Sequence, residues 1–130
     1  MSEKAEEALR LHGEGCNCCQ AVVAALAGEE GLSREDAMRV GAAFGGGMRR
    51  GEVCGAVTGA LMILGLKYGA DAPEQQDRKA DANARTIEFM KAFEERHGSY
   101  LCRELLKASG KKICAEVIAG ASALLEERGY

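Results

Sequence analysis

Residues 52–68 read EVCGAVTGALMILGLKY, and this segment indicates the architecture most clearly. It is apolar on every side, a pattern typical of a helix buried inside a protein. Gly51, Gly55 and Gly59 recur at every fourth position, so we expect them to lie on one face, where small residues let another helix approach closely. The longest apolar run, 53–66, is shorter than the roughly 20 residues that span a bilayer. The segment therefore predicts a buried central helix and no membrane insertion.

The rest of the chain favours helices as well. Ala, Leu, Glu, Lys and Arg dominate, proline occurs once, and strand-like alternation is absent. No linker is long enough to divide residues 1–130 into two domains. We predict an all-α fold, a compact single-domain bundle of six or seven helices around the Gly/Ala-rich helix at about 52–68. The other predicted helices cover 3–11, 17–28, 33–44, 71–96, 99–108 and 111–127, with Ser33, Asp71 and Ser99 as N-caps.

Hydrophobic periodicity indicates which sides of the two longest outer helices face the core. In the helix over 71–96 the expected inward residues are Ala84, Ile87, Met90 and Phe93, and its polar first half is expected to face solvent. The last helix has the clearest period, and its expected inward residues are Ile113, Cys114, Val117, Ile118, Ala121, Leu124 and Leu125.

Charge and composition exclude several classes of partner. The chain has 130 residues, 47% hydrophobic and 28% charged, with a formal net charge of −3 and no Trp. An acidic chain with few aromatic residues gives no reason to expect nucleic acid as a partner. The N-terminus is acidic and has no apolar signal core, so we expect the protein in the cytoplasm. Cysteines in a reducing compartment are expected to be free thiols, metal ligands or buried packing residues.

Six cysteines are present, at positions 16, 18, 19, 54, 102 and 114. Cys18, Cys54, Cys102 and Cys114 each fall near a predicted helix start, where free amides and the helix dipole favour a thiolate. No C-x-x-C occurs, so a shared site must be assembled by tertiary folding. Adjacent residues on a helix point in different directions, so at most one of Cys18 and Cys19 is expected to face the site of Cys54. Cys16 could act as a resolving thiol from the preceding turn.

These motifs together resemble a known family. They are Gly15-Cys16-Asn17-Cys18-Cys19-Gln20-Ala21-Val22, then Phe44-Gly45-Gly46-Gly47-Met48, then Cys54-Gly55-Ala56-Val57-Thr58-Gly59, then Cys102-Arg103-Glu104-Leu105-Leu106 and finally Cys114. In this order they resemble the C-GCAxxG-C-C family of redox-active proteins over nearly the whole chain. The resemblance implies that the four family cysteines are Cys18, Cys54, Cys102 and Cys114, and that the partner is an electron-transfer or transport-associated protein. It implies no role for Cys16 or Cys19.

Three hypotheses for function follow. In the first, Cys18, Cys54, Cys102 and Cys114 bind a metal centre, with an iron–sulfur cluster preferred and zinc second. In the second, two candidate catalytic thiols, for example Cys18 and Cys54, exchange between dithiol and disulfide without metal. In the third, the protein is a structural or adaptor protein whose cysteines are buried. No C-x-x-C-H is present, so covalent haem is not expected.

Other features are interpreted as structural. The glycine-rich stretch 45–51 is expected to be a helix-breaking turn, because it lacks the lysine and spacing of a phosphate-binding loop. His12 and His97 are expected to cap helix C-termini, although either could ligate a metal. The Gly51, Gly55 and Gly59 face is expected to pack inside one subunit, with a homodimer contact as the alternative.

Overall fold

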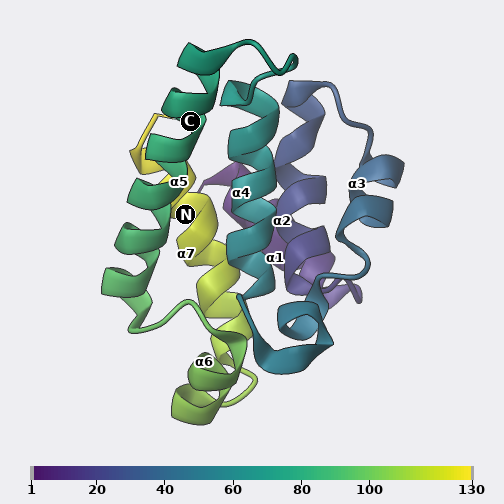
Figure 1. The fold of residues 1–130 in the computed structure, drawn as a ribbon. Coiled ribbons are helices and arrows are strands. Elements are labelled where there is room, and N and C mark those ends of the chain that lie inside the picture. Colours follow the sequence, from purple (N-terminus) through teal and green to yellow (C-terminus); the bar gives the residue numbers. More distant parts are fainter. Residues whose placement is uncertain (1, 130) are drawn as a thin grey trace.

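A computed structural model describes residues 2–129 and confirms the all-α prediction. Figure 1 shows a bundle with α4 in the middle, α3 at one edge and α6 projecting below the other helices. Within the described residues, seven α-helices are joined by short turns, a 3-10 segment (η1) and a π-type segment (η2). Their bounds are α1 Glu3–Gly13, α2 Cys18–Leu26, η1 Ala27–Glu30, α3 Arg34–Gly41, η2 Gly47–Gly51, α4 Gly55–Tyr68, α5 Gln76–His97, α6 Cys102–Ser109 and α7 Ile113–Glu127.

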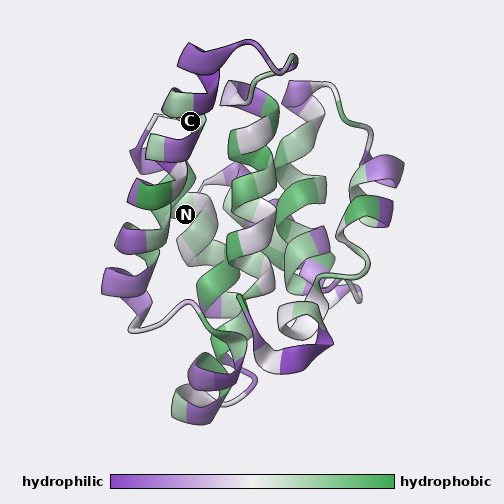
Figure 2. Ribbon diagram, in the orientation of Figure 1, coloured by the Kyte–Doolittle hydropathy of each residue, from purple (hydrophilic) through white to green (hydrophobic). Residues whose placement is uncertain are grey.

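The centre of the bundle is α4, as predicted from its apolar sequence. It contacts α2, α5 and α7, and Figure 2 shows hydrophobic residues along these inner helices, with hydrophilic residues along α5. Two glycines set the approach of α4 to α2. A Cβ atom on Gly55 would lie 3.0 Å from the backbone nitrogen of Cys19, and one on Gly59 would lie 3.1 Å from its carbonyl oxygen. The glycine face therefore packs within the chain, against the helix that begins with Cys18.

The start of α4 differs from the prediction. The helix was expected from residue 52, but it begins at Gly55, with Cys54 as its N-cap. Val53 instead pairs with Leu101 in an isolated antiparallel bridge. The Cys54 amide donates to the Tyr100 carbonyl at 2.8 Å, which holds the backbone extended just before the helix. Gly51 therefore lies outside α4 and does not share its glycine face.

Local hydrogen bonds confirm the predicted N-cap of α3 and correct the predicted N-cap of α5. Ser33 caps α3 as expected, through a bond from the Asp36 amide. Asp71 does not cap α5, because the Gln75 side chain accepts the Asp71 amide and holds a turn there, so the helix starts only at Gln76.

The cap expected at Ser99 is also displaced. The Ser99 hydroxyl accepts the amide of Leu101 and donates to the Glu104 carboxylate, while α6 itself begins at Cys102. This side chain therefore fixes the segment that precedes α6 and does not cap its first turn.

The third predicted helix is shorter than expected. α3 ends at Gly41 and not near residue 44, since the Asn17 side-chain amide donates to the Gly41 and Ala42 carbonyls. The same Asn17 begins α2, where it forms a reciprocal capping box with Gln20. An Asn followed three residues later by Gln is a recognisable capping-box pattern, and it places the start of α2 directly after Asn17.

The inward side of α5 is only partly as predicted. Phe93 is buried, but Ile87 is 70% exposed and the other buried residues are Phe89 and Ala92. The stripe that faces α4 and α7 is set by Phe89 and Phe93, which lie four residues apart and stack on each other. Ile87 lies two residues before Phe89, so it is turned about 200° away at 100° per residue. The polar first half of α5 is exposed, as expected.

In α7 the predicted core residues are buried, and Cys114 is half-buried. Every helix in residues 2–129 is too short or too polar to cross a bilayer.

Candidate functional site

A left-handed turn forms one wall of the site. Gly46, Gly47, Met48 and Arg49 all have φ between 60° and 62°. Glycine is required at position 47, because a Cβ atom there would lie 2.5 Å from the Glu52 nitrogen and 2.9 Å from the Cβ atom of Cys102. Met48 and Arg49 are non-glycine residues in this region, which costs about 1–2 kcal/mol each. The expected helix-breaking turn is thus a defined structure that packs on the start of α6.

Four cysteines begin four helices, as the sequence predicts. Cys18 is the first residue of α2, Cys54 the N-cap of α4, Cys102 the first residue of α6 and Cys114 the second residue of α7. Helix starts present amides that lack partners within the helix, which is a favourable setting for sulfur that carries negative charge.

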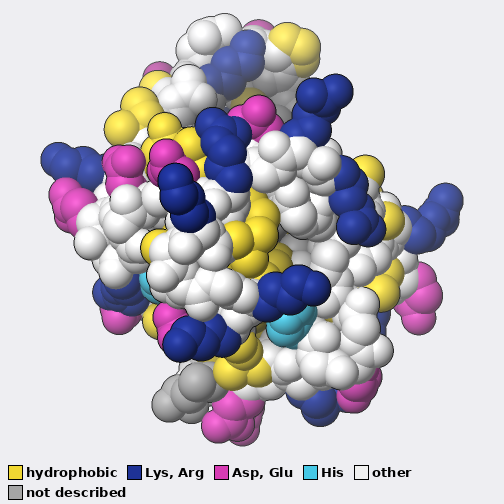
Figure 3. Space-filling view, turned by 90° about the horizontal axis from the view of Figure 1, so that it is seen from below, with side chains coloured by type: hydrophobic (Ala, Val, Ile, Leu, Met, Phe, Trp, Pro, Cys, Tyr) yellow, Lys and Arg dark blue, Asp and Glu magenta, His cyan; other side chains and the backbone are white. Residues whose placement is uncertain are grey.

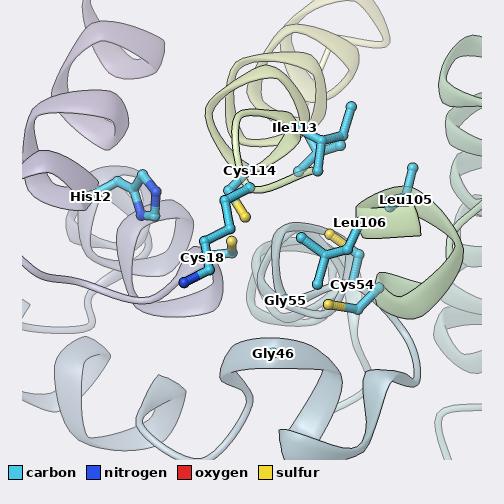
Figure 4. Close-up of a pocket in the computed structure, with 12 residues that line it drawn as sticks. His12, Cys18, Gly46, Cys54, Gly55, Leu105, Leu106, Ile113 and Cys114 are labelled. Atoms are coloured by element: carbon cyan, nitrogen blue, oxygen red, sulfur yellow. The ribbon is translucent and has the colours of Figure 1, made fainter. Parts of the chain in front are cut away.

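All four cysteines line one cavity of about 250 Å³. Figure 4 shows this cavity, with Cys18 and Cys114 close to each other and Cys54 across from them. Its other lining residues are mostly apolar: His12, Gly46, Gly55, Leu105, Leu106, Lys111, Ile113 and Val117. Tertiary folding therefore brings together residues that are up to 96 positions apart, from Cys18 to Cys114.

The bridge between Val53 and Leu101 places Cys54 and Cys102. Besides the bond from Cys54 to Tyr100, the Cys102 amide donates to the Glu52 carbonyl at 2.7 Å. In this bridge Cys54 is opposite Tyr100, so Cys54 and Cys102 are diagonal neighbours on the same face. Diagonal neighbours of this kind lie about 7–8 Å apart. Cys102 and Cys114 also line the same cavity. They do so although a short turn joins α6 to α7, and Cys102, at the start of α6, lies farther along its helix from that turn than Cys114 does.

The pKa values of Cys18, Cys54 and Cys102 are all raised, contrary to the expectation that helix starts would favour their thiolates. Burial raises the pKa of Cys54 to about 11; the Ala56 and Val57 amides at the start of α4 oppose this rise, and the Cys102 and Cys114 sulfurs add to it. Burial is also the largest cause of the raised pKa of Cys18, and the neighbouring Cys114 and Cys54 thiols raise it further. Loss of solvation therefore outweighs the helix dipole.

Cys18 and Cys114 lie next to each other in the cavity, as Figure 4 shows. After burial, the Cys114 thiol is the largest cause that raises the pKa of Cys18, through charge and through side-chain hydrogen bonding. Burial and then the nearby Cys114 likewise raise the pKa of Cys102. In residues 2–129 no group of three or more His, Cys, Asp or Glu side chains is arranged to hold a single metal ion, and all six cysteines are free.

Cys16 and Cys19 lie outside the cavity. The Cys16 thiol contacts the Met38 sulfur at 3.4 Å, and Cys19 is fully buried, with its thiol 3.9 Å from the Met62 sulfur. The prediction that only one of Cys18 and Cys19 shares a site with Cys54 is confirmed, and that residue is Cys18. The resolving role suggested for Cys16 has no geometric support, since its sulfur points toward α3.

The two histidines differ in position. His12 lies at the edge of the cavity near Cys18, and its Nδ1 is 2.9 Å from the Cys16 carbonyl oxygen. His97 lies elsewhere, packed on Phe93, and its Nε2 is buried with no hydrogen-bond partner. Burial, then the charge of Arg96, lowers the pKa of His97, while Glu116 raises it. His97 therefore packs between helices and does not serve as the expected C-terminal cap.

Sequence reasoning missed several residues of the site. Lys111 and the apolar side chains Leu105 and Leu106 line the cavity, but their spacing carries no signal that connects them to cysteines elsewhere in the chain. His12 is predicted from the sequence to be a helix cap. Its proximity to Cys18 depends on the turn between α1 and α2, which the spacing does not indicate.

One family model matches the chain. It is C_GCAxxG_C_C, described as "Putative redox-active protein", and it covers residues 16–128, which include all four cysteines of the cavity. Neither the curated proteins nor the solved structures contain a significant match to this sequence.

Proposed function

Because the chain belongs to the C-GCAxxG-C-C family of redox-active proteins, we propose that its four-cysteine cavity binds a thiolate-ligated metal centre that transfers electrons. An iron–sulfur cluster, which spans several atoms, is the preferred occupant. Zinc is the second, and it would require the four sulfurs to move closer together, because in residues 2–129 no side chains are grouped around a single ion. The observation that carries the proposal is the convergence of Cys18, Cys54, Cys102 and Cys114, one from each of four helix starts, on one cavity.

The residues present fit such a group by their chemistry. Four thiols are the usual ligand set of iron–sulfur clusters and of closed zinc sites. The other lining side chains include Leu105, Leu106 and Ile113, which limit water and offer no competing oxygen ligands. A cavity of about 250 Å³ has room for more than one atom between the sulfurs. When bound, the cluster would supply reversible one-electron storage.

The protein's own residues have three tasks in this proposal. The four cysteines give up their protons on binding, since only thiolates ligate metals. The amides of Ala56 and Val57, which already favour the Cys54 thiolate, reduce the repulsion between negative sulfurs. The left-handed turn at Gly46 and Gly47 holds the start of α6 in place, so that Cys102 faces the cavity.

The decisive experiment is anaerobic reconstitution with ferrous iron and sulfide. We expect stoichiometric iron and sulfide and a visible absorbance in the wild type, and loss of most of both in Cys54→Ser. Cys19→Ser is the matched control, because Cys19 is equally buried but lies outside the cavity. Equal iron content in wild type, Cys54→Ser and Cys19→Ser would contradict the proposal. A parallel titration with zinc alone separates the two occupants.

The contact between Cys18 and Cys114 favours a second function, dithiol–disulfide exchange. These two thiols would transfer two electrons and two protons to an oxidising disulfide, forming one S–S bond and leaving two reduced thiols on the oxidant. The nearness of the two side chains in Figure 4 supports Cys114 as the partner of Cys18, whereas the sequence suggests Cys54 as an example.

Oxidised glutathione tests this second function on the metal-free protein. We expect two of six thiols to be lost reversibly and a peptide map to contain the Cys18–Cys114 crosslink. Cys114→Ser should abolish the crosslink, whereas Cys16→Ser should not. Retention of all six thiols would rule out exchange and, if no metal binds either, leave a structural role for the cysteines.

A further inference from the structure

We infer that the rim of the cysteine cavity is a docking surface for an acidic segment of a partner protein. We call this rim the basic face and define it as residues 45–54 and 101–114. It consists of the left-handed turn with η2, α6 and the turn into α7. The inference rests on the proposed redox function only for its biological purpose, because the docking itself requires neither a bound metal nor a disulfide.

The charge of the basic face is opposite to that of the whole protein. The chain carries 17 Lys and Arg against 20 Asp and Glu. The basic face carries two carboxylates, Glu52 and Glu104, against six cations: Arg49, Arg50, Arg103, Lys107, Lys111 and Lys112. Cations are therefore concentrated where the cavity opens, and acidic residues dominate elsewhere.

Most of these cations are not neutralised. Arg103 forms an ion pair with Glu52 at 3.2 Å. Within residues 2–129 the other five cations of the basic face make no ion pair, and all six are exposed. Both carboxylates are already engaged, since Glu104 accepts a hydrogen bond from Ser99. Unpaired cations grouped on one face attract an acidic surface and steer its approach.

The centre of the face is apolar. Figure 3 looks at this end of the molecule and shows hydrophobic side chains in the middle with dark blue Lys and Arg side chains around them. Met48 is 37% exposed on the left-handed turn, and Leu106 is half-buried at the cavity. An apolar centre inside a charged rim is the common anatomy of a protein–protein interface.

The distribution of the cations favours a protein segment over a small anion. Of the six, only Lys111 lines the cavity; the others lie outside it, on three different segments. A small anion could contact one or two of them, whereas an extended acidic segment can contact cations on all three segments. The occupant to which we commit is therefore an acidic stretch of a partner protein.

The test is a titration of the whole metal-free protein under reducing conditions with a 20-residue poly-L-glutamate peptide, followed by backbone amide NMR shifts. We expect shifts confined to the basic face and binding that weakens steeply with salt. Arg49→Glu with Arg50→Glu should weaken binding by about tenfold or more. The matched control is Arg78→Glu with Lys79→Glu, two exposed cations at the start of α5, at the opposite end of the molecule in Figure 1; it should leave binding unchanged.

Four other outcomes overturn the inference, and a comparison with iron uptake separates its failure from that of the proposed function. No binding, shifts spread over the whole surface, or equal loss in both double variants would show that the basic face does not select acidic segments. Citrate that produces the same shifts at equal affinity would identify a small-anion site instead. If poly-L-glutamate does not bind although the protein takes up iron, only the docking inference fails. If it binds to a protein that holds no iron and keeps all six thiols, only the proposed function fails.

Discussion

At Cys54 two physical effects oppose each other. The first amides of α4 stabilise a thiolate there, while burial, with only 4% of the residue exposed, stabilises the neutral thiol. Burial is the larger effect and raises the pKa of Cys54 to about 11. The Cys54 thiol, which the sequence predicts to be reactive, therefore favours its protonated form. It reacts when a metal displaces the proton or when oxidation removes it.

This raised pKa predicts how stability depends on pH. The folded protein keeps the Cys54 proton to higher pH than the unfolded chain does, so alkaline pH favours unfolding. The free energy of unfolding should be fully retained only below the unfolded pKa of about 8.5, and it should fall by about 3 kcal/mol in total as the pH rises through about 11. Urea denaturation of reduced, metal-free protein measures this. Cys54→Ser should flatten the decline, and an identical slope in the variant would contradict the assignment.

Among the helices, the contact between α4 and α2 depends on two positions without side chains. A Cβ atom on Gly59 would lie 3.1 Å from the Cys19 carbonyl oxygen and 3.2 Å from the Val22 Cβ atom. Gly65, on the same helix, has nothing within 4 Å of its Cβ position. The two glycines thus separate the effect of close packing from the effect of helix propensity.

We predict opposite outcomes for these glycines. Gly59→Ala should lower the free energy of unfolding by about 1–2 kcal/mol, because α4 must move from α2. Gly65→Ala should raise it by about 0.5–1 kcal/mol, since alanine favours the helix and meets no neighbour. Thermal or urea denaturation of both variants is the measurement. A loss of stability at both positions would mean that packing at Gly59 is not the cause.

The left-handed turn also contains two glycines that can be compared directly. Gly46 and Gly47 have nearly the same φ, but only Gly47 lacks room for a Cβ atom. Gly46→Ala should cost about 1–2 kcal/mol for the backbone alone. Gly47→Ala should cost clearly more and should also reduce iron uptake, because the start of α6 must shift. Equal stability of the two variants would show that this turn tolerates the clash with Cys102.

Over the described residues, the first and last helices belong to one packed unit. α1 contacts α7, and both contact α2, so the first and last helices share the core of the bundle. We therefore predict a single cooperative unfolding transition for residues 1–130, as for one domain. Differential scanning calorimetry checks this by comparing the calorimetric with the van't Hoff enthalpy. Two resolved transitions would contradict the single-domain prediction.

Much of the fold follows from local signals. The Ser33 cap, the end of the fifth helix close to residue 96 and the clear period of α7 depend on residues within one or two turns, and the structure agrees with them. The failures have non-local causes: Gln75 delays α5, and the Val53–Leu101 bridge delays α4. Ile87 was misassigned because a short apolar pattern fits two faces of a long helix that is mostly polar.

Residue order along the chain is enough to predict a helical protein in which four of the six cysteines begin helices and match a redox-active family. These features depend on periodicity and residue order, which act along the chain. Three features became visible only from the packing of the helices: the cavity that the four cysteines share, the position of Cys18 next to Cys114 and the cations around the apolar centre of this face. The reason is that helix directions are fixed by packing and hydrogen bonds between distant segments, such as Val53 with Leu101, which no local spacing encodes.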